Sequence, residues 1–149
     1  MTYFEVMGEP QGKARARTFY NSKLGRMQSI TPEGTVLYEN LVKQCFLANC
    51  TETYFEKEPL EMVITAHFPI PKSASKKDKL LMRVWKVFPT KKPDADNIAK
   101  CICDALNGVA YGDDTQIVRM TVNKVYADHE PKVCVFLGEI KLGAGICTT

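Results

Sequence analysis

The chain has 149 residues, about one domain's worth, and its 45% hydrophobic and 25% charged residues exclude wholesale disorder. The longest uninterrupted apolar run, at 133–137, is far too short for a membrane-spanning helix, which needs about 20 residues. The start of the chain lacks the pattern of a secretory signal. We therefore expect one cytoplasmic domain over residues 1–149, with no membrane partner and a loose tail at 143–149.

The net charge of +3 conceals two strongly cationic segments. Residues 11–26 contain five basic residues and no acid, and residues 72–92 contain eight basic residues and one acid. The rest of the chain is therefore acidic overall. Such segregation indicates a polyanionic partner more clearly than the net value does.

The first half of the chain predicts strands around one helix. A short strand is expected at Thr2–Met7, and a second at Arg15–Tyr20 would place Arg15 and Arg17 on the same side. Residues 21–29 are polar and predict a turn. Thr31-Pro32 predicts a helix start, with Thr31 as the cap and Pro32 in the first helical position.

The second half begins with alternating apolar residues at 60–68, which predict a strand with one buried face. A short helix is expected at 76–82. A longer helix should begin near Asp94 and end at Asn107-Gly108, because an apolar stripe repeats at helical spacing between them. Residues 117–140 predict an antiparallel hairpin. The expected fold class is α+β, with a mixed, largely antiparallel sheet and helices packed on one face.

Six cysteines occur in the chain, and their spacing does not favour a metal site. No CxxC pair is present, and neither histidine lies near a cysteine pair in the sequence. Disulfides suit small secreted proteins, whereas this chain shows no export signal. We expect free and mostly packed thiols.

Acidic residues gather around the start of the helix expected after Asp94. Asp94 and Asp96 fall at its N-terminal edge, Lys100 follows four residues after Asp96, and Asp113-Asp114 come after a short loop. Each acid taken alone suits a helix cap, a first turn or a polar turn. Together, carboxylates this close repel unless a cation lies between them, and all-oxygen ligation favours Mg²⁺ or Mn²⁺. A cationic wall beside such a site predicts metal-dependent nucleic-acid chemistry.

The same segment resembles the RusA family of Holliday junction resolvases, in the form common in phages and prophages. The matching motifs are Lys92-Pro93-Asp94-Ala95-Asp96-Asn97, Lys100, Asp104-Ala105-Leu106-Asn107-Gly108, Tyr111 and residues 113–118. Weaker agreement extends to Gly12-Lys13-Ala14-Arg15-Ala16-Arg17 and to the strands after residue 124.

The resemblance implies a Mg²⁺-dependent endonuclease that cuts four-way DNA junctions as a homodimer during recombination and repair, with Mn²⁺ as a possible substitute. Asp94, Asp96 and Asp114 are the implied catalytic metal ligands, and Lys100 is the implied catalytic lysine. Asp113 is a candidate for supporting the neighbouring ligand Asp114 without binding the metal itself. Asp104 is a candidate for orienting Lys100.

The two cationic segments are expected to bind phosphates of DNA. The candidate DNA-binding residues are Lys13, Arg15, Arg17, Lys72, Lys76, Lys77, Lys91 and Lys92. Three aromatic residues, Tyr20, Trp85 and Phe88, are candidates for contact with the open centre of a junction, although packing in the core or between subunits is the favoured interpretation.

Two other functions remain open at the level of sequence. The same acids would serve a metal-dependent nuclease that prefers flaps or replication forks. The basic segments alone would serve a junction-binding protein without catalysis.

Overall fold

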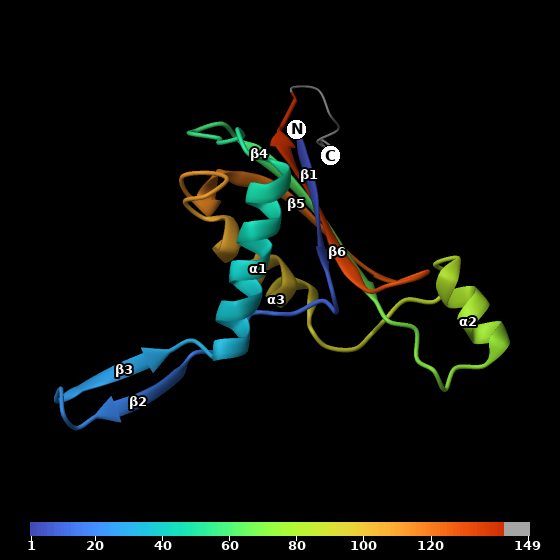
Figure 1. Cartoon of the computed structure of the whole chain (residues 1–149), viewed down its shortest axis with the longest axis horizontal. Coiled ribbons are helices and arrows are strands. Elements are labelled where there is room, and N and C mark those ends of the chain that lie inside the picture. Colours follow the sequence, from blue (N-terminus) through green and yellow to red (C-terminus); the bar gives the residue numbers. More distant parts are fainter. Residues whose placement is uncertain (142–149) are drawn as a thin grey trace, which may run out of the picture.

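The computed structural model describes residues 1–141 and contains a mixed four-stranded sheet, a separate two-stranded hairpin and three α-helices (Figure 1). The tail expected at 143–149 lies outside the described residues. The elements are β1 (Thr2–Met7), β2 (Arg17–Asn21), β3 (Arg26–Ile30), α1 (Glu33–Asn49), β4 (Leu60–Phe68), α2 (Lys76–Arg83), α3 (Ala95–Leu106), the 3₁₀ turn η1 (Asp114–Gln116), β5 (Ile117–Tyr126) and β6 (Lys132–Glu139).

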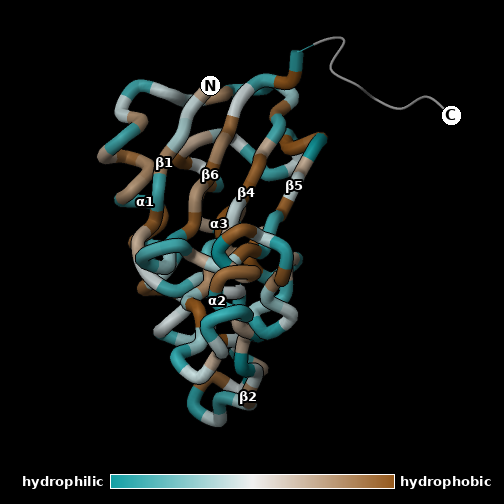
Figure 2. Tube along the Cα trace, turned by 90° about the vertical axis from the view of Figure 1, so that its right-hand side faces the viewer, coloured by the Kyte–Doolittle hydropathy of each residue, from teal (hydrophilic) through white to brown (hydrophobic). Residues whose placement is uncertain are grey.

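The sheet has the strand order β1-β6-β4-β5, which Figure 2 shows from one side. β6 runs antiparallel to both β1 and β4, whereas β4 and β5 are parallel. The expectation of an antiparallel hairpin over 117–140 is therefore wrong, because β4 lies between β5 and β6. The turn at 128–131 does reverse the chain, but β4 pairs with both β5 and β6 and therefore lies between them.

Two helices cover one face of this sheet, which confirms the α+β class (Figure 1). Alternate residues of β4 from Leu60 to Phe68 are buried beneath them, as the sequence predicted. The apolar stripe of α3 is also fully covered. Phe4 of β1 meets Phe46 of α1 edge-on at 5.6 Å between ring centroids, so the N-terminal strand and α1 share this core.

Helix α1 begins one residue later than expected. Pro32, and not Thr31, takes the cap position, and its carbonyl oxygen accepts hydrogen bonds from the backbone N–H groups of Thr35 and Val36. A proline just outside the helix loses nothing by lacking an N–H donor, since that donor has no partner in the first turn of a helix.

The hairpin β2–β3 projects away from the sheet, and its side chains are almost all exposed (Figure 1). β2 starts at Arg17, so Arg15 lies outside the strand in which it was expected. β3 is a strand within a segment predicted as a turn. Its residues, Arg-Met-Gln-Ser-Ile, do not alternate in polarity because neither face of this hairpin packs on the core.

Helix α2 was correctly predicted, but it contains no buried residue and projects on the side of the sheet opposite α1 and α3 (Figure 1). Ser75 caps it by accepting a hydrogen bond from the backbone N–H of Asp78 at 3.1 Å. No helix within residues 1–141 is long and apolar enough to cross a membrane.

All five described cysteines are free, in agreement with the sequence, and Cys147 lies outside the described residues. Cys101 and Cys103 are buried in α3, and this burial raises their thiol pKa values to about 12 and about 11. Since only the thiolate is an effective nucleophile, we expect both thiols to resist a soluble disulfide reagent at pH 7 and to react fully after denaturation. Mass-resolved labelling checks this, and rapid labelling of Cys101 in folded protein would contradict the burial.

Candidate active site

Asp94 occupies the cap position of α3, yet its carboxylate makes no capping hydrogen bond. The backbone carbonyl oxygen of Asp94 accepts a hydrogen bond from the N–H of Ile98 at 3.0 Å. The main chain of Asp94 therefore starts the helix, whereas its carboxylate does not take part in capping. Asp96 follows in the first turn and is exposed. Neither carboxylate has an ion-pair partner among residues 1–141.

Lys100 is exposed one turn after Asp96, and the ion pair that the spacing of four allows is not formed. No hydrogen bond or ion pair holds the Lys100 ammonium group within the described part of the chain. The ammonium is therefore available for an external anion beside Asp96.

Asp113 and Asp114 are positioned by a well-anchored turn. The Asp113 carboxylate accepts the backbone N–H of Thr115 at 3.2 Å, and Gln116 returns a side-chain oxygen to the N–H of Asp113 at 3.1 Å. The amide nitrogen of Gln116 donates to the carbonyl oxygens of Phe55 and Glu58. Asp113 therefore caps η1, which is a structural role compatible with its predicted place behind the ligands.

Asp114 lies in an acidic environment. The adjacent Asp113 side chain raises the pKa of the Asp114 carboxyl, and burial and the negative charge of Asp104 add to this. Asp104 belongs to the last turns of α3, eight residues or about 12 Å along the helix from Asp96. The negative charges of both Asp113 and Asp104 therefore act on Asp114.

The predicted metal ligands fit Mg²⁺ in chemistry but do not form a closed coordination group. Exposed carboxylate oxygens are the donors that Mg²⁺ prefers. Within residues 1–141, however, no three His, Cys, Asp or Glu side chains are arranged to hold one metal ion. The metal-binding role of Asp94, Asp96 and Asp114 stays a prediction.

Lys13 differs from the other predicted DNA-binding residues, because its charge is already used within the protein. The Lys13 ammonium lies 2.5 Å from the Glu39 carboxylate of α1 and 2.9 Å from the Asp104 carboxylate of α3. Burial favours a lower pKa for Lys13, but the hydrogen bonds to Glu39 and Asp104 outweigh it and raise the pKa. Lys13 therefore has two acidic partners within the protein, its contact with DNA phosphate stays a prediction, and Asp104 pairs with Lys13 where an interaction with Lys100 was expected.

The backbone around Lys13 also holds α3 in place. The N–H of Lys13 donates to the carbonyl oxygen of Asn97 at 3.0 Å, and the N–H of Ala14 donates to the hydroxyl of Thr35 at 3.4 Å. Gly12 approaches so closely that a Cβ atom there would lie 2.8 Å from the Cβ of Pro93. We call the Gly12-Lys13 segment with Glu39 and Asp104 the α3 clamp, since it ties the first turn of α3 to α1.

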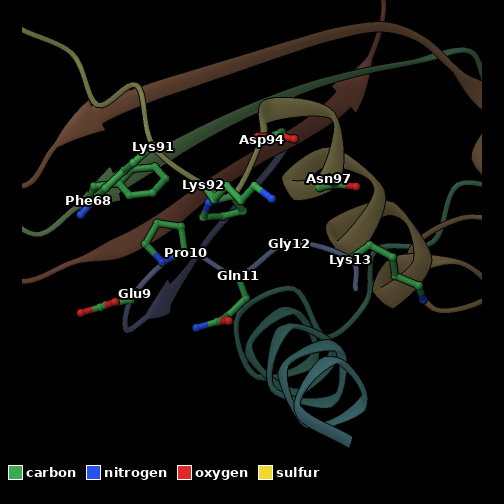
Figure 3. A pocket seen from close by; sticks show the side chains of 11 residues that line it. Glu9, Pro10, Gln11, Gly12, Lys13, Phe68, Lys91, Lys92, Asp94 and Asn97 are labelled. Atoms are coloured by element: carbon green, nitrogen blue, oxygen red, sulfur yellow. The ribbon is translucent and has the colours of Figure 1, made fainter. Parts of the chain in front are cut away.

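A cavity of about 430 Å³ opens next to Asp94 (Figure 3). Its lining combines the cations Lys91 and Lys92 with Gly12 and Lys13 of the α3 clamp and the apolar ring of Phe68. The lining residues are Glu9, Pro10, Gln11, Gly12, Lys13, Phe68, Lys91, Lys92, Pro93, Asp94 and Asn97. The Lys91 ammonium lies 5.8 Å from the centroid of the Phe68 ring. Both residues line the cavity, so a cationic side chain borders it beside Asp94.

The remaining predicted DNA-binding residues are exposed and lie on two projecting elements and on the approach to α3. Arg17 belongs to β2, and Arg15 immediately precedes it; Lys76 and Lys77 begin α2. None of these four, nor Lys72 or Lys92, forms an ion pair within the described residues. Sequence reasoning missed Glu39, because an acid on a helix gives no local signal of a partner 26 residues away.

Comparison with known proteins identifies the family. The family model described as Endodeoxyribonuclease RusA matches residues 7–137. The chain is also 33% identical over 139 residues to the protein named "Uncharacterized protein YqaN" of Bacillus subtilis (strain 168), a match that covers 92% of this chain and 95% of that protein. The family match includes α3, both acidic ends of that helix and the α3 clamp. The chain therefore belongs to the RusA endodeoxyribonuclease family.

Proposed function

We propose that this protein is a Mg²⁺-dependent endonuclease that resolves four-way DNA junctions by paired symmetric nicks in recombination and repair. The observation that carries the proposal is the first turn of α3. There Asp94 and Asp96 are exposed, as is Lys100 one turn later, and none of the three has an ion-pair partner within residues 1–141; Asp94 lines a cavity bordered by Lys91 and Lys92. A helix holds such groups at fixed positions, which suits a site that acts on a ligand.

The proposed role of each residue follows from the charge of its side chain. Asp94, Asp96 and Asp114 would hold the metal ion, which supplies an activated water and polarises the phosphate when bound. Lys100 offsets negative charge that develops on the phosphate in the transition state. Arg15, Arg17, Lys72, Lys76, Lys77, Lys91 and Lys92 hold the flanking phosphates, so binding should weaken steeply with salt.

A homodimer is part of the same proposal. A four-way junction has approximate twofold symmetry, and a C₂ dimer would present two active sites related in the same way. Each subunit would then cut one of two equivalent strands. The proposed setting is the cytoplasm of a bacterial cell, with the gene carried by a phage or prophage.

A panel of labelled DNA substrates tests the proposal. With Mg²⁺, we expect paired nicks in a four-way junction and at least about tenfold slower cutting of a flap, a fork and a linear duplex, because only the junction presents two equivalent strands to both sites. Adding EDTA should stop cleavage. Equal rates on linear duplex would contradict a resolvase, and faster cutting of flaps or forks would favour that class of nuclease. Binding without any cleavage in Mg²⁺ or Mn²⁺ would indicate a non-catalytic junction-binding protein.

A further inference from the structure

A second cavity, of about 420 Å³, lies between the segment that follows α2 and the edge strand β5. Trp85 and Phe88 line it from the α2 side, and their side chains are 49% and 54% exposed. Strand β5 contributes Asn123 and Lys124, and Thr65 of β4 adds a hydroxyl. Trp85 and Phe88, for which packing in the core or between subunits was the favoured interpretation, are therefore half-exposed around a hollow.

The Trp85 ring is held in place although it is half-exposed. Its backbone adopts a φ of 57°, in the left-handed region that non-glycine residues rarely occupy. The indole N–H donates to the carbonyl oxygen of Tyr126 at 3.2 Å, and the ring lies 6.1 Å from that of His67. The left-handed φ follows from the end of α2, because Trp85 comes directly after the C-cap Val84 and the N–H groups of Trp85 and Lys86 donate back to the carbonyl oxygens of Met82 and Leu81.

The charge around this cavity suits an anionic polymer. Residues 72–92, which include Trp85 and Phe88, carry eight basic residues and one acid. The Lys124 ammonium, which lines the cavity, donates to the carbonyl oxygen of Lys91 and lies 5.2 Å from the Phe68 ring centroid. Lys91 also lines the cavity beside Asp94, so Lys124 connects the two cavities.

We propose that the cavity between Trp85, Phe88 and β5 binds an unpaired nucleobase of the DNA substrate. The proposal rests on the proposed function for its substrate class and adds a base-stacking site to it. Every base has a flat face that can stack on an aromatic ring, and the Asn123 amide and Thr65 hydroxyl offer hydrogen bonds to a base edge. A four-way junction supplies bases that can unstack at its centre. Cations along the rim favour this occupant over an apolar protein surface.

Trp85 is the only tryptophan of the chain, so its fluorescence reports this site directly. We would titrate the full chain in EDTA with a 12-nucleotide oligothymidylate, a four-way junction and a linear duplex. The oligothymidylate and the junction should quench Trp85 emission, and the duplex should quench it much less. Phe88→Ala should weaken oligothymidylate binding about tenfold or more, the range that loss of one stacked base produces.

Matched variants separate stacking from other contributions. Phe88→Leu keeps the apolar bulk without an aromatic face and should weaken binding nearly as much as Phe88→Ala. Leu37→Ala removes an exposed apolar side chain on α1 and should leave binding unchanged. Thermal unfolding should show that Phe88→Ala folds, since the ring is half-exposed.

Two results would overturn the base-stacking site. One is DNA binding, measured by anisotropy, that leaves Trp85 emission unchanged. The other is shielding of Trp85 in DNA-free protein by self-association that Phe88→Ala abolishes, which would assign the cavity to a second copy of the chain. The outcome is independent of cleavage: quenching by oligothymidylate in a chain that cuts no junction would uphold this site and contradict the proposed function.

Discussion

Asp96→Asn is expected to reduce cleavage of a four-way junction by at least about a hundredfold while leaving junction binding within a few-fold of the parent. The Asp96 carboxylate is exposed and has no ion-pair partner within residues 1–141, so the fold does not depend on its charge. The amide has the same shape and removes the negative charge that the proposed metal ion requires. Single-turnover cleavage in Mg²⁺ and anisotropy in Ca²⁺ measure the two quantities separately.

Glu130→Gln is a matched control for this experiment, because Glu130 is also exposed and unpaired in the described structure but lies in the turn before β6. It should cut at the parent rate. Parent-like cleavage by Asp96→Asn would remove Asp96 from the proposed site. Equal losses in both variants would point to a general effect of charge on DNA binding.

Lys13→Met is expected to lower the free energy of unfolding by about 1–3 kcal/mol, below the full cost of breaking a deeply buried ion pair because the site is partly solvated. The side chains of Lys13, Glu39 and Asp104 are 22%, 20% and 29% exposed, and the substitution leaves two carboxylates facing each other without their shared cation. Chemical denaturation of the parent and variant measures the difference. Lys23→Met, at the exposed end of the β2–β3 hairpin, should change stability by less than about 0.5 kcal/mol.

A double-mutant cycle tests whether the three charges act as a unit. Glu39→Gln alone should cost less than Lys13→Met, because Asp104 still neutralises Lys13. Adding Glu39→Gln to Lys13→Met should recover part of the loss by removing one of the two facing negative charges. Additive effects would show that the α3 clamp does not depend on this cluster. A cleavage rate that falls further than the unfolded fraction explains would support a positioning role for Lys13.

Much of the local structure could be predicted from the sequence, because burial on one side of a helix or strand leaves a periodic pattern. The alternation at 60–68 marked β4 to the residue, and the stripe between Asp94 and Gly108 marked α3. The hairpin β2–β3 was only half predicted. Neither of its faces is buried, so no alternation marked β3.

The arrangement of charges could not be predicted in the same way. Lys13 is 91 positions from Asp104 in the chain, and each of them also suits a solvated surface or a DNA contact. Only the packing of α1 against α3 places Glu39 and Asp104 on either side of the Lys13 ammonium. The close approach of the Gly12-Lys13 segment to the start of α3 explains why Gly12 is a glycine, since a side chain there would collide with Pro93.

The sequence by itself determined the α+β class, the positions of the helices and the exposed acid–lysine motif at the start of α3, since each depends on residues close together in the chain. The tertiary structure alone decided that β4 lies between β5 and β6, that Lys13 is an internal ion-pair partner, and that Trp85 and Phe88 border an open cavity. The physical reason is the same in each case. Strand pairing, ion pairing and exposure depend on which distant segments of the chain contact one another. One local sequence pattern is compatible with many different sets of such contacts.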